Sequence, residues 1–263
     1  RFQAVDPSVG AVRSLNSVAA LVGCVMVLAA LVIIWVARLS IGRDVYVSVM
    51  GATGMPTAGW FQFALVLVAL GGGLIAFVSR SIRVSQPVLR WWRPAVSLGL
   101  ASAFFFVSSQ VTCTPGCPLP YGPKFTWPDF THTTSAILAF AFACWAMLQL
   151  TRVSGRRMMA ALSLCCGIAV ALIAGAGGLM SLANWEVGLG SRFEFAAATI
   201  AILWLVSLGV VIAMPNLPLL AWRPGMAAFR RRVPAVPSAS SQSVSDATAS
   251  RQQTDAGGLA AQQ

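Results

Sequence analysis

The residues best suited to chemistry gather in one short stretch, 113–134, which holds two cysteines, an aspartate and the only histidine of the chain. Cys113 and Cys117 are separated by the turn sequence Thr-Pro-Gly, and this short spacing predicts a structural disulfide. Thiol–disulfide exchange is the sharper alternative, although its usual motif has two residues between the cysteines. With one histidine and no second cysteine pair, we expect no metal and no cofactor.

The same stretch contains a helix start. Thr126 is suited to cap the helix, Pro128 to its first turn, and Asp129 stands three residues after Thr126 as in a capping box. His132 follows one turn later on the face of Asp129, which can orient it. Ser135 lies one turn further. Three residues stacked along one helix provide neither a nucleophile elbow nor an oxyanion hole, so we assign no catalytic residue.

The composition indicates the elements that must position these residues. The chain has 263 residues, of which 57% are hydrophobic and 10% charged, whereas a soluble domain is about 25% charged. Its surroundings are therefore expected to be lipid. The net charge of +11 would suggest nucleic acid in a soluble protein, but we interpret it as membrane topology and expect no nucleic-acid partner. Of the 18 basic residues, 17 are arginine, which suggests a GC-rich bacterial genome, and we expect the protein in the bacterial cell (inner) membrane.

Six apolar segments are each long enough to span a bilayer, which needs about 20 residues. Because only closed backbone hydrogen bonding survives in hydrocarbon, they predict an all-α polytopic bundle of six transmembrane helices. The N-terminal segment 1–14 and the basic, then disordered tail 215–263 flank this domain of residues 15–214. The six expected spans are 16–37, 59–78, 94–111, 129–150, 158–180 and 194–214.

Arginine and lysine predict the orientation of the bundle. If the N-terminus is cytoplasmic, 14 of the 18 basic residues fall in inner segments, and both termini lie in the cytoplasm. Glycine-rich runs in the second and fifth spans predict close helix packing. Tryptophans fall near the expected span ends, as in an aromatic belt. The four basic residues on the outer side are Arg38, Arg43, Lys124 and Arg192.

Arg192 and Glu194 stand at the outer mouth of the sixth span. An ionisable group at a span end is inexpensive where it reaches water, so interface anchoring explains both. The functional alternative is that they converge with Asp129 and His132 in an outward-facing polar pocket. Such a pocket would bind a lipid headgroup, another anionic group or an envelope protein partner, and the first outer loop would cover it.

Four short motifs are VSVMGATG, CTPGCPLP, DFTHTTSAILAF and GLGSRFEF. Together they resemble the bacterial "domain of unknown function 998" membrane family, which is distantly similar to the Frag/DRAM/Sfk-type membrane proteins. The resemblance covers most of residues 15–214. It implies six transmembrane helices, no established activity, and site positions at Asp129, His132 and Arg192.

These features favour a non-enzymatic multi-pass membrane protein over two alternatives. An intramembrane lipid hydrolase that uses zinc would need about three protein ligands, and the chain offers a single histidine. A small-molecule transporter usually carries ionisable groups or broken helices at the membrane midplane, and we find no ionisable residue in the middle of any expected span.

Overall fold

The computed structural model describes residues 7–82, 92–118, 123–153, 157–183 and 185–214. This part of the chain is helical and contains no strand. All the described helices belong to one compact unit, Arg1–Trp222, whereas the second unit, Arg223–Gln263, and the predicted tail lie outside the described residues. The α-helices are α1 (Pro7–Ile41), α2 (Ala58–Val78), α3 (Pro94–Gln110), α4 (Trp127–Leu150), α5 (Arg157–Leu182) and α6 (Val187–Ala213).

The predicted all-α architecture is confirmed, and five of the described helices are long and apolar enough to cross a membrane. The exception is α3, whose 17 residues extend about 26 Å at 1.5 Å per residue. The two largest differences from the predicted boundaries are at helix starts. Helix α1 begins at Pro7 rather than 16, and α6 begins at Val187 rather than 194. In both cases the helix continues beyond its apolar stretch into polar sequence, because backbone hydrogen bonds do not require lipid.

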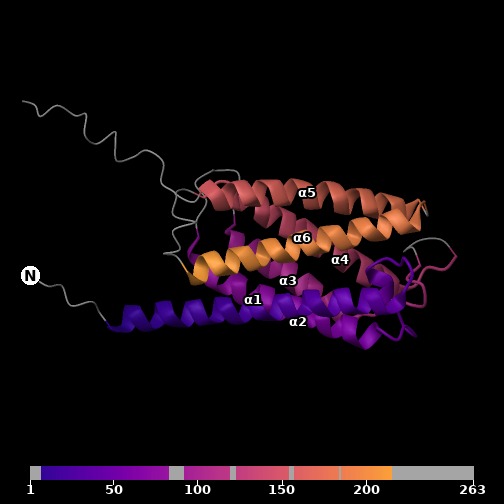
Figure 1. The fold of residues 1–263 in the computed structure, drawn as a ribbon, viewed down its shortest axis with the longest axis horizontal. Coiled ribbons are helices and arrows are strands. Elements are labelled where there is room, and N and C mark those ends of the chain that lie inside the picture. Colours follow the sequence, from indigo (N-terminus) through magenta and orange to yellow (C-terminus); the bar gives the residue numbers. More distant parts are fainter. Residues whose placement is uncertain (1–6, 83–91, 119–122, 154–156, 184, 215–263) are drawn as a thin grey trace, which may run out of the picture. The chain divides into compact units, whose positions relative to one another are not determined.

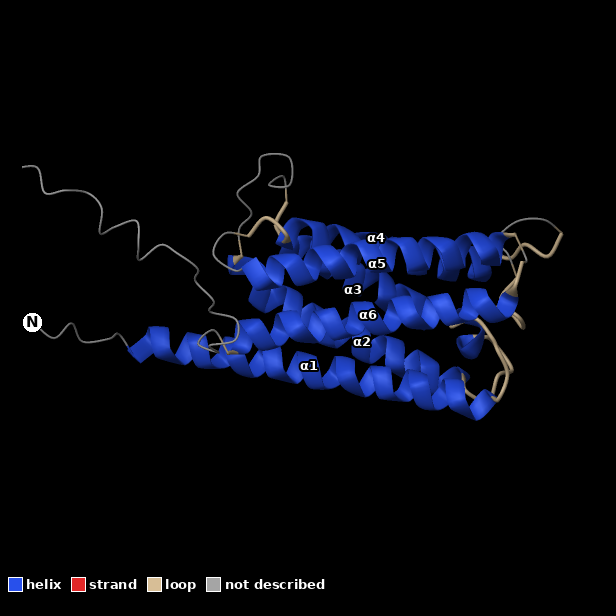
Figure 2. Ribbon diagram, turned by 45° about the horizontal axis from the view of Figure 1, so that its top comes forward, coloured by secondary structure: helices blue, strands red, loops and turns tan. Residues whose placement is uncertain are grey.

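The described helices lie side by side along one axis (Figures 1 and 2), and their contacts close a ring. Each helix packs against the next along the chain, and α6 packs against α1. Two short 3₁₀ helices accompany α2: η1 (Ser48–Gly51) precedes it and η2 (Ser79–Ser81) follows it. The ring arrangement brings the connection before α2 close to the connection before α4 and to the first turns of α6.

Glycines permit a close contact between α1 and α2. A Cβ atom added to Gly23 of α1 would lie 2.8 Å from the backbone oxygen of Gly71 in α2, and the reverse distance is also 2.8 Å. Neither position accepts a side chain unless the backbones separate. The predicted packing role of the glycine-rich run in α2 is therefore confirmed at Gly71, whereas Gly73 faces open space.

The outward faces of the helices are apolar. Leu172 and Leu179 of α5 are each 68% exposed, and Leu39 of α1 is 75% exposed. A soluble monomer rarely exposes large apolar side chains in continuous patches. Helices that are apolar on all sides are typical of a bundle surrounded by lipid.

Candidate functional site

The candidate site lies at the end of the bundle where α2, α4 and α6 begin, each preceded by a connection. We call these connections the cap: the described residues of 42–57 before α2, of 111–126 before α4 and of 183–186 before α6. The backbone N–H of Thr53 donates to the carbonyl of Cys113 at 2.9 Å, and the Thr53 hydroxyl donates to the same carbonyl at 3.1 Å. The connections before α2 and α4 are thus joined by direct hydrogen bonds.

Asp129 is fully buried at the start of α4, and its carboxylate accepts three hydrogen bonds. The backbone N–H of Thr114 donates to Oδ1 at 2.7 Å, and the hydroxyls of Thr114 and Thr126 donate to Oδ2 at 2.9 and 2.5 Å. Thr126 also accepts the backbone N–H of Asp129 at 3.2 Å, which confirms the predicted helix cap. The carboxylate therefore joins the start of α4 to the turn between the two cysteines.

His132 is 4% exposed and is directed toward the end of α3. Its Nδ1 lies 2.7 Å from the carbonyl oxygen of Val111 and 3.0 Å from that of Ser108. A carbonyl oxygen can only accept, so Nδ1 carries the proton and donates. In the neutral ring, Nε2 is left with its lone pair.

The two cysteines lie beside this histidine. Cys113 and Cys117 have their sulfurs 2.13 Å apart and their Cα atoms 5.1 Å apart, so the predicted disulfide is confirmed. A ring nitrogen of His132 and the two sulfurs all lie within 4.8 Å of one another. Local sequence does not predict this proximity, because His132 lies 15 positions after the nearer cysteine.

Glu194 holds the first connection onto α6. Its Oε2 accepts the backbone N–H of Val47 at 2.8 Å. Tyr46, next to Val47, packs against Gly190, where a Cβ atom would lie 2.6 Å from the Tyr46 hydroxyl. Burial, and then the negative charge of Glu194, raise the pKa of the Tyr46 hydroxyl above its usual value of 10.0.

Asp44 joins two arginines from different helices. It forms an ion pair with Arg38 in the last turn of α1, and its Oδ2 lies 3.4 Å from Arg192 of α6. The Arg38 guanidinium also donates to the carbonyls of Arg43 and Val45, both at 3.2 Å. The side chain of Arg38 is 14% exposed and that of Arg192 is 72% exposed. The guanidinium of Arg38 therefore stabilises the connection before α2, whereas the guanidinium of Arg192 is largely exposed.

The hydrogen bonds place the four predicted pocket residues in two groups. Asp129 and His132 belong to the α3–α4 side, and Arg192 and Glu194 belong to α6. Within the described parts of the chain, no hydrogen bond or ion pair joins the groups directly. The connection before α2 contacts both, because Val47 donates to Glu194 and the Ser48 carbonyl lies 3.7 Å from the sulfur of Cys113. The convergence of all four residues on one ligand stays a prediction.

The suggested Asp, His and Ser trio does not form a catalytic triad. The Asp129 carboxylate bonds to threonines, and the protonated nitrogen of His132 bonds to α3 carbonyls. Among the described residues, no hydrogen bond joins Asp129 to His132 or His132 to Ser135. The trio therefore lacks the proton-transfer chain that a serine hydrolase requires.

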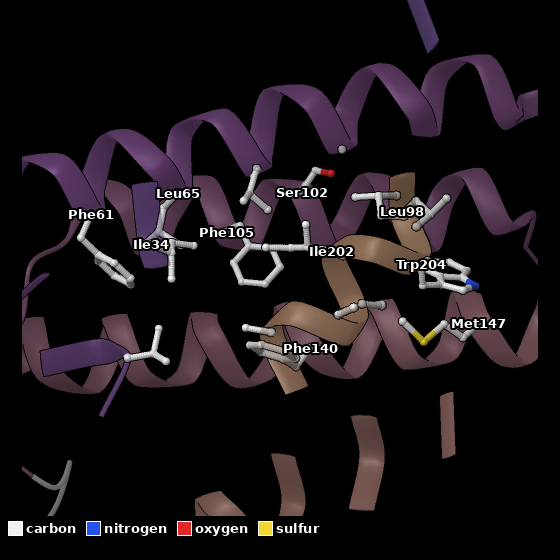
Figure 3. A pocket seen from close by; sticks show the side chains of 18 residues that line it. Ile34, Phe61, Leu65, Leu98, Ser102, Phe105, Phe140, Met147, Ile202 and Trp204 are labelled. Carbon is white, nitrogen blue, oxygen red and sulfur yellow. The ribbon is translucent and has the colours of Figure 1, made fainter. Parts of the chain in front are cut away.

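An apolar cavity of about 90 Å³ lies between the helices, on the bundle side of the cap. Its lining comes from α1, α2, α3, α4 and α6, with Val47 of the cap at one side. Figure 3 shows labelled side chains from Phe61 to Met147 converging on this space. The polar lining groups are Ser102 and the Trp204 indole, whose N–H donates to Ser163 at 3.0 Å. The lining of the cavity is therefore almost entirely apolar.

Sequence reasoning missed several polar residues that the fold buries. Gln149 is fully buried at the end of α4. It accepts a hydrogen bond from the Ser97 hydroxyl at 2.7 Å and donates to the Trp92 carbonyl at 2.9 Å. A glutamine in an apolar run is the available signal, since a polar group in lipid requires a partner. For Asp44, no local pattern indicates that two arginines lie near it.

Comparison with family models, with curated proteins and with solved structures finds no match to the chain. The resemblance to the "domain of unknown function 998" family therefore stays a prediction. Function is inferred from the geometry of the chain itself.

Proposed function

We propose that this chain is a six-span protein of the bacterial inner membrane that binds an anionic lipid and catalyses no reaction. The observation that carries the proposal is the apolar cavity beside the cap. On α2 its lining extends from Phe61 to Gly72, which corresponds to about 16 Å along the helix at 1.5 Å per residue. A narrow apolar space of this length suits one hydrocarbon chain better than a compact ligand.

The path of the chain supports α3 as the sixth span. Helices α2 and α4 both begin at the cap, so the chain must return from the far end of α2 before α4 starts. Helix α3 is the described helix that makes this return, since it follows α2 and ends next to Cys113 at the cap. Its short apolar length is tolerated where the local bilayer thins or where flanking residues reach the headgroups.

Charge and aromatic residues support a cap on the outer side, with both termini in the cytoplasm. The cap end carries four of the 18 basic residues of the chain. Trp60, Trp127 and Trp185 lie at the cap ends of α2, α4 and α6 and are 65%, 71% and 63% exposed. Exposed tryptophans at one level are typical of the headgroup region. Labelling of an introduced cysteine at Gly54 from the cytoplasmic side alone would contradict this orientation.

Arg192 supports an anionic headgroup. Its side chain is 72% exposed, and its contact with Asp44 is long, at 3.4 Å, so the guanidinium remains able to pair with a phosphate. Arg192 precedes the cavity residue Ala198 by six positions on α6, about 9 Å along the axis. A lipid whose phosphate meets Arg192 can therefore direct a chain toward the cavity.

The proposal is tested by native mass spectrometry of the detergent-purified chain with phosphatidylglycerol or phosphatidylcholine. We expect retention of phosphatidylglycerol by the unchanged chain. Ala143→Leu narrows the cavity and should reduce the retained lipid severalfold. Arg192→Gln should remove the preference for phosphatidylglycerol over phosphatidylcholine while some lipid is still retained.

Ala141→Leu provides the matched control, because Ala141 lies on the same helix with its side chain exposed. It adds the same volume outside the cavity and should leave retention unchanged. The proposal is wrong if the unchanged chain retains no lipid, or if Ala143→Leu and Ala141→Leu retain equal amounts.

A further inference from the structure

The disulfide of the cap lies next to a histidine that a structural crosslink does not require. A disulfide that closes so short a loop constrains the unfolded chain less than one that closes a long loop. The cluster nevertheless includes a buried imidazole within 4.8 Å of both sulfurs. Two sulfurs and one imidazole nitrogen form the donor set that thiophilic metal ions prefer.

We propose that reduction of the Cys113–Cys117 disulfide converts this cluster into a binding site for a thiophilic d¹⁰ metal ion of the Zn²⁺ class. The three protein ligands are the Cys113 and Cys117 thiolates and a His132 ring nitrogen. A site with three protein ligands leaves a fourth position open for water or another donor. Oxidation closes the site, because the two sulfurs then bond to each other.

The histidine is held as a metal-binding histidine usually is. Metal ligands of this type commonly donate their second ring N–H to a backbone carbonyl, which fixes the tautomer and the ring orientation. His132 donates from Nδ1 to Val111 and Ser108 at 2.7 and 3.0 Å. In the neutral ring, this arrangement puts the lone pair on Nε2, as a metal ligand requires.

The cysteines have the spacing and the turn that a metal site requires. Three residues separate them, within the C-x₂₋₄-C range of zinc sites. The Cys117 N–H donates to the Thr114 carbonyl at 2.9 Å, which closes the turn between them. Gly116 and Cys117 have φ values of +82° and +47°, so the turn passes through the left-handed region. Asp129 holds Thr114 and therefore supports the turn without acting as a ligand.

The redox step is an ordinary thiol–disulfide exchange with a dithiol reductant. Cys117 is half-buried and Cys113 is fully buried, so a thiolate of the reductant attacks the Cys117 sulfur and Cys113 leaves as a thiolate. The second thiolate of the reductant then releases Cys117 and forms the reductant's own disulfide. The protein disulfide has gained two electrons and two protons. Metal binding subsequently releases both thiol protons to solvent.

The test uses the full-length chain in detergent, reduced with a phosphine and titrated with Zn²⁺ against a chromogenic chelator. Cys165→Ser and Cys166→Ser are combined in the starting chain, because these neighbouring free cysteines could bind zinc themselves. We expect one tightly bound Zn²⁺ per reduced chain and none in the oxidised chain. Cys117→Ser and His132→Gln should each weaken binding at least about tenfold. Cys144→Ser is the control and should bind unchanged.

A second measurement leaves Cys113, Cys117 and His132 unchanged. Its result therefore does not depend on whether variants at these three residues fold. Co²⁺ added to the reduced starting chain should produce thiolate-to-metal charge-transfer absorption together with the visible bands of a tetrahedral ion. The proposal is overturned if the reduced chain binds no Zn²⁺ and shows no such absorption. It is also overturned if folded Cys117→Ser and His132→Gln bind Zn²⁺ as tightly as the starting chain. Lipid retention plays no part in these readouts, so the proposed function can fail independently.

Discussion

The cap and the middle of the bundle are stabilised in different ways. The cap depends on directional contacts: a disulfide, the three hydrogen bonds to Asp129 and the ion pair of Arg38 with Asp44. The middle depends on shape, with backbone contact between Gly23 and Gly71 and apolar side chains around the cavity. In the cap, polar groups that leave water must find hydrogen-bond partners. In the middle, lipid surrounds the helices and provides no hydrophobic driving force, so close packing must hold them together.

The two regions are therefore expected to tolerate different substitutions. In the middle, an apolar residue on the lipid-facing side is easily replaced by another, but a single methyl group at a glycine contact forces the helices apart. In the cap, side-chain size matters less than the loss of one acceptor. The following three predictions test this contrast, from the largest expected effect to the smallest.

The largest effect is expected for Gly71→Val. The new Cβ would lie 2.8 Å from the Gly23 backbone oxygen and 2.7 Å from the Val27 side chain, so α1 and α2 must separate. We expect the free energy of unfolding to fall by about 3 kcal/mol, the upper end of the usual overpacking cost. The measurement is unfolding in mixed detergent micelles. Gly73→Val is the matched control, since a Cβ there meets open space. Equal destabilisation by both variants would contradict the shape-based account of the middle.

A smaller effect is expected for Asp129→Asn. The carboxylate accepts from two threonine hydroxyls and one backbone N–H, and an amide replaces one acceptor oxygen with a donor. We expect a loss of about 2 kcal/mol of unfolding free energy, the range for hydrogen bonds to a charged group. Glu186→Gln makes the same chemical change at an exposed position and should have little effect. If the two variants unfold alike, the Asp129 hydrogen bonds do not stabilise the cap.

The smallest effect is a pH dependence that arises from Tyr46. Its pKa is raised in the folded chain by burial and by Glu194, so the folded state holds this proton more tightly than the unfolded state. Stability is therefore lost as pH rises above the ordinary tyrosine pKa of about 10. The unfolding temperature of Tyr46→Phe should decrease less steeply than that of the unchanged chain between pH 9 and 11. Parallel slopes would show that Tyr46 does not contribute in this way.

Local sequence was sufficient for the helices and for the contacts between near neighbours. Long apolar runs predict α2 to within one residue at each end, because burial of backbone polar groups in lipid requires helix. The Thr126 cap and the Cys113–Cys117 bond each join residues three or four positions apart, so turn chemistry alone predicts them. The starts of α1 and α6 were the exceptions, since both helices continue beyond their apolar runs into polar sequence.

Only the tertiary structure decided which distant groups meet. Val47 and Glu194 are 147 positions apart, and their hydrogen bond exists because α6 closes the ring against α1. The same closure places Asp44 between two arginines and leaves an apolar cavity among five helices. The sequence by itself determined two properties of the chain. Its composition indicates a helical membrane protein, and the local spacing of its cysteines predicts a polar loop closed by a disulfide. Ring closure determined the neighbours of that loop, because side chains on separate helices become partners only after the helices pack.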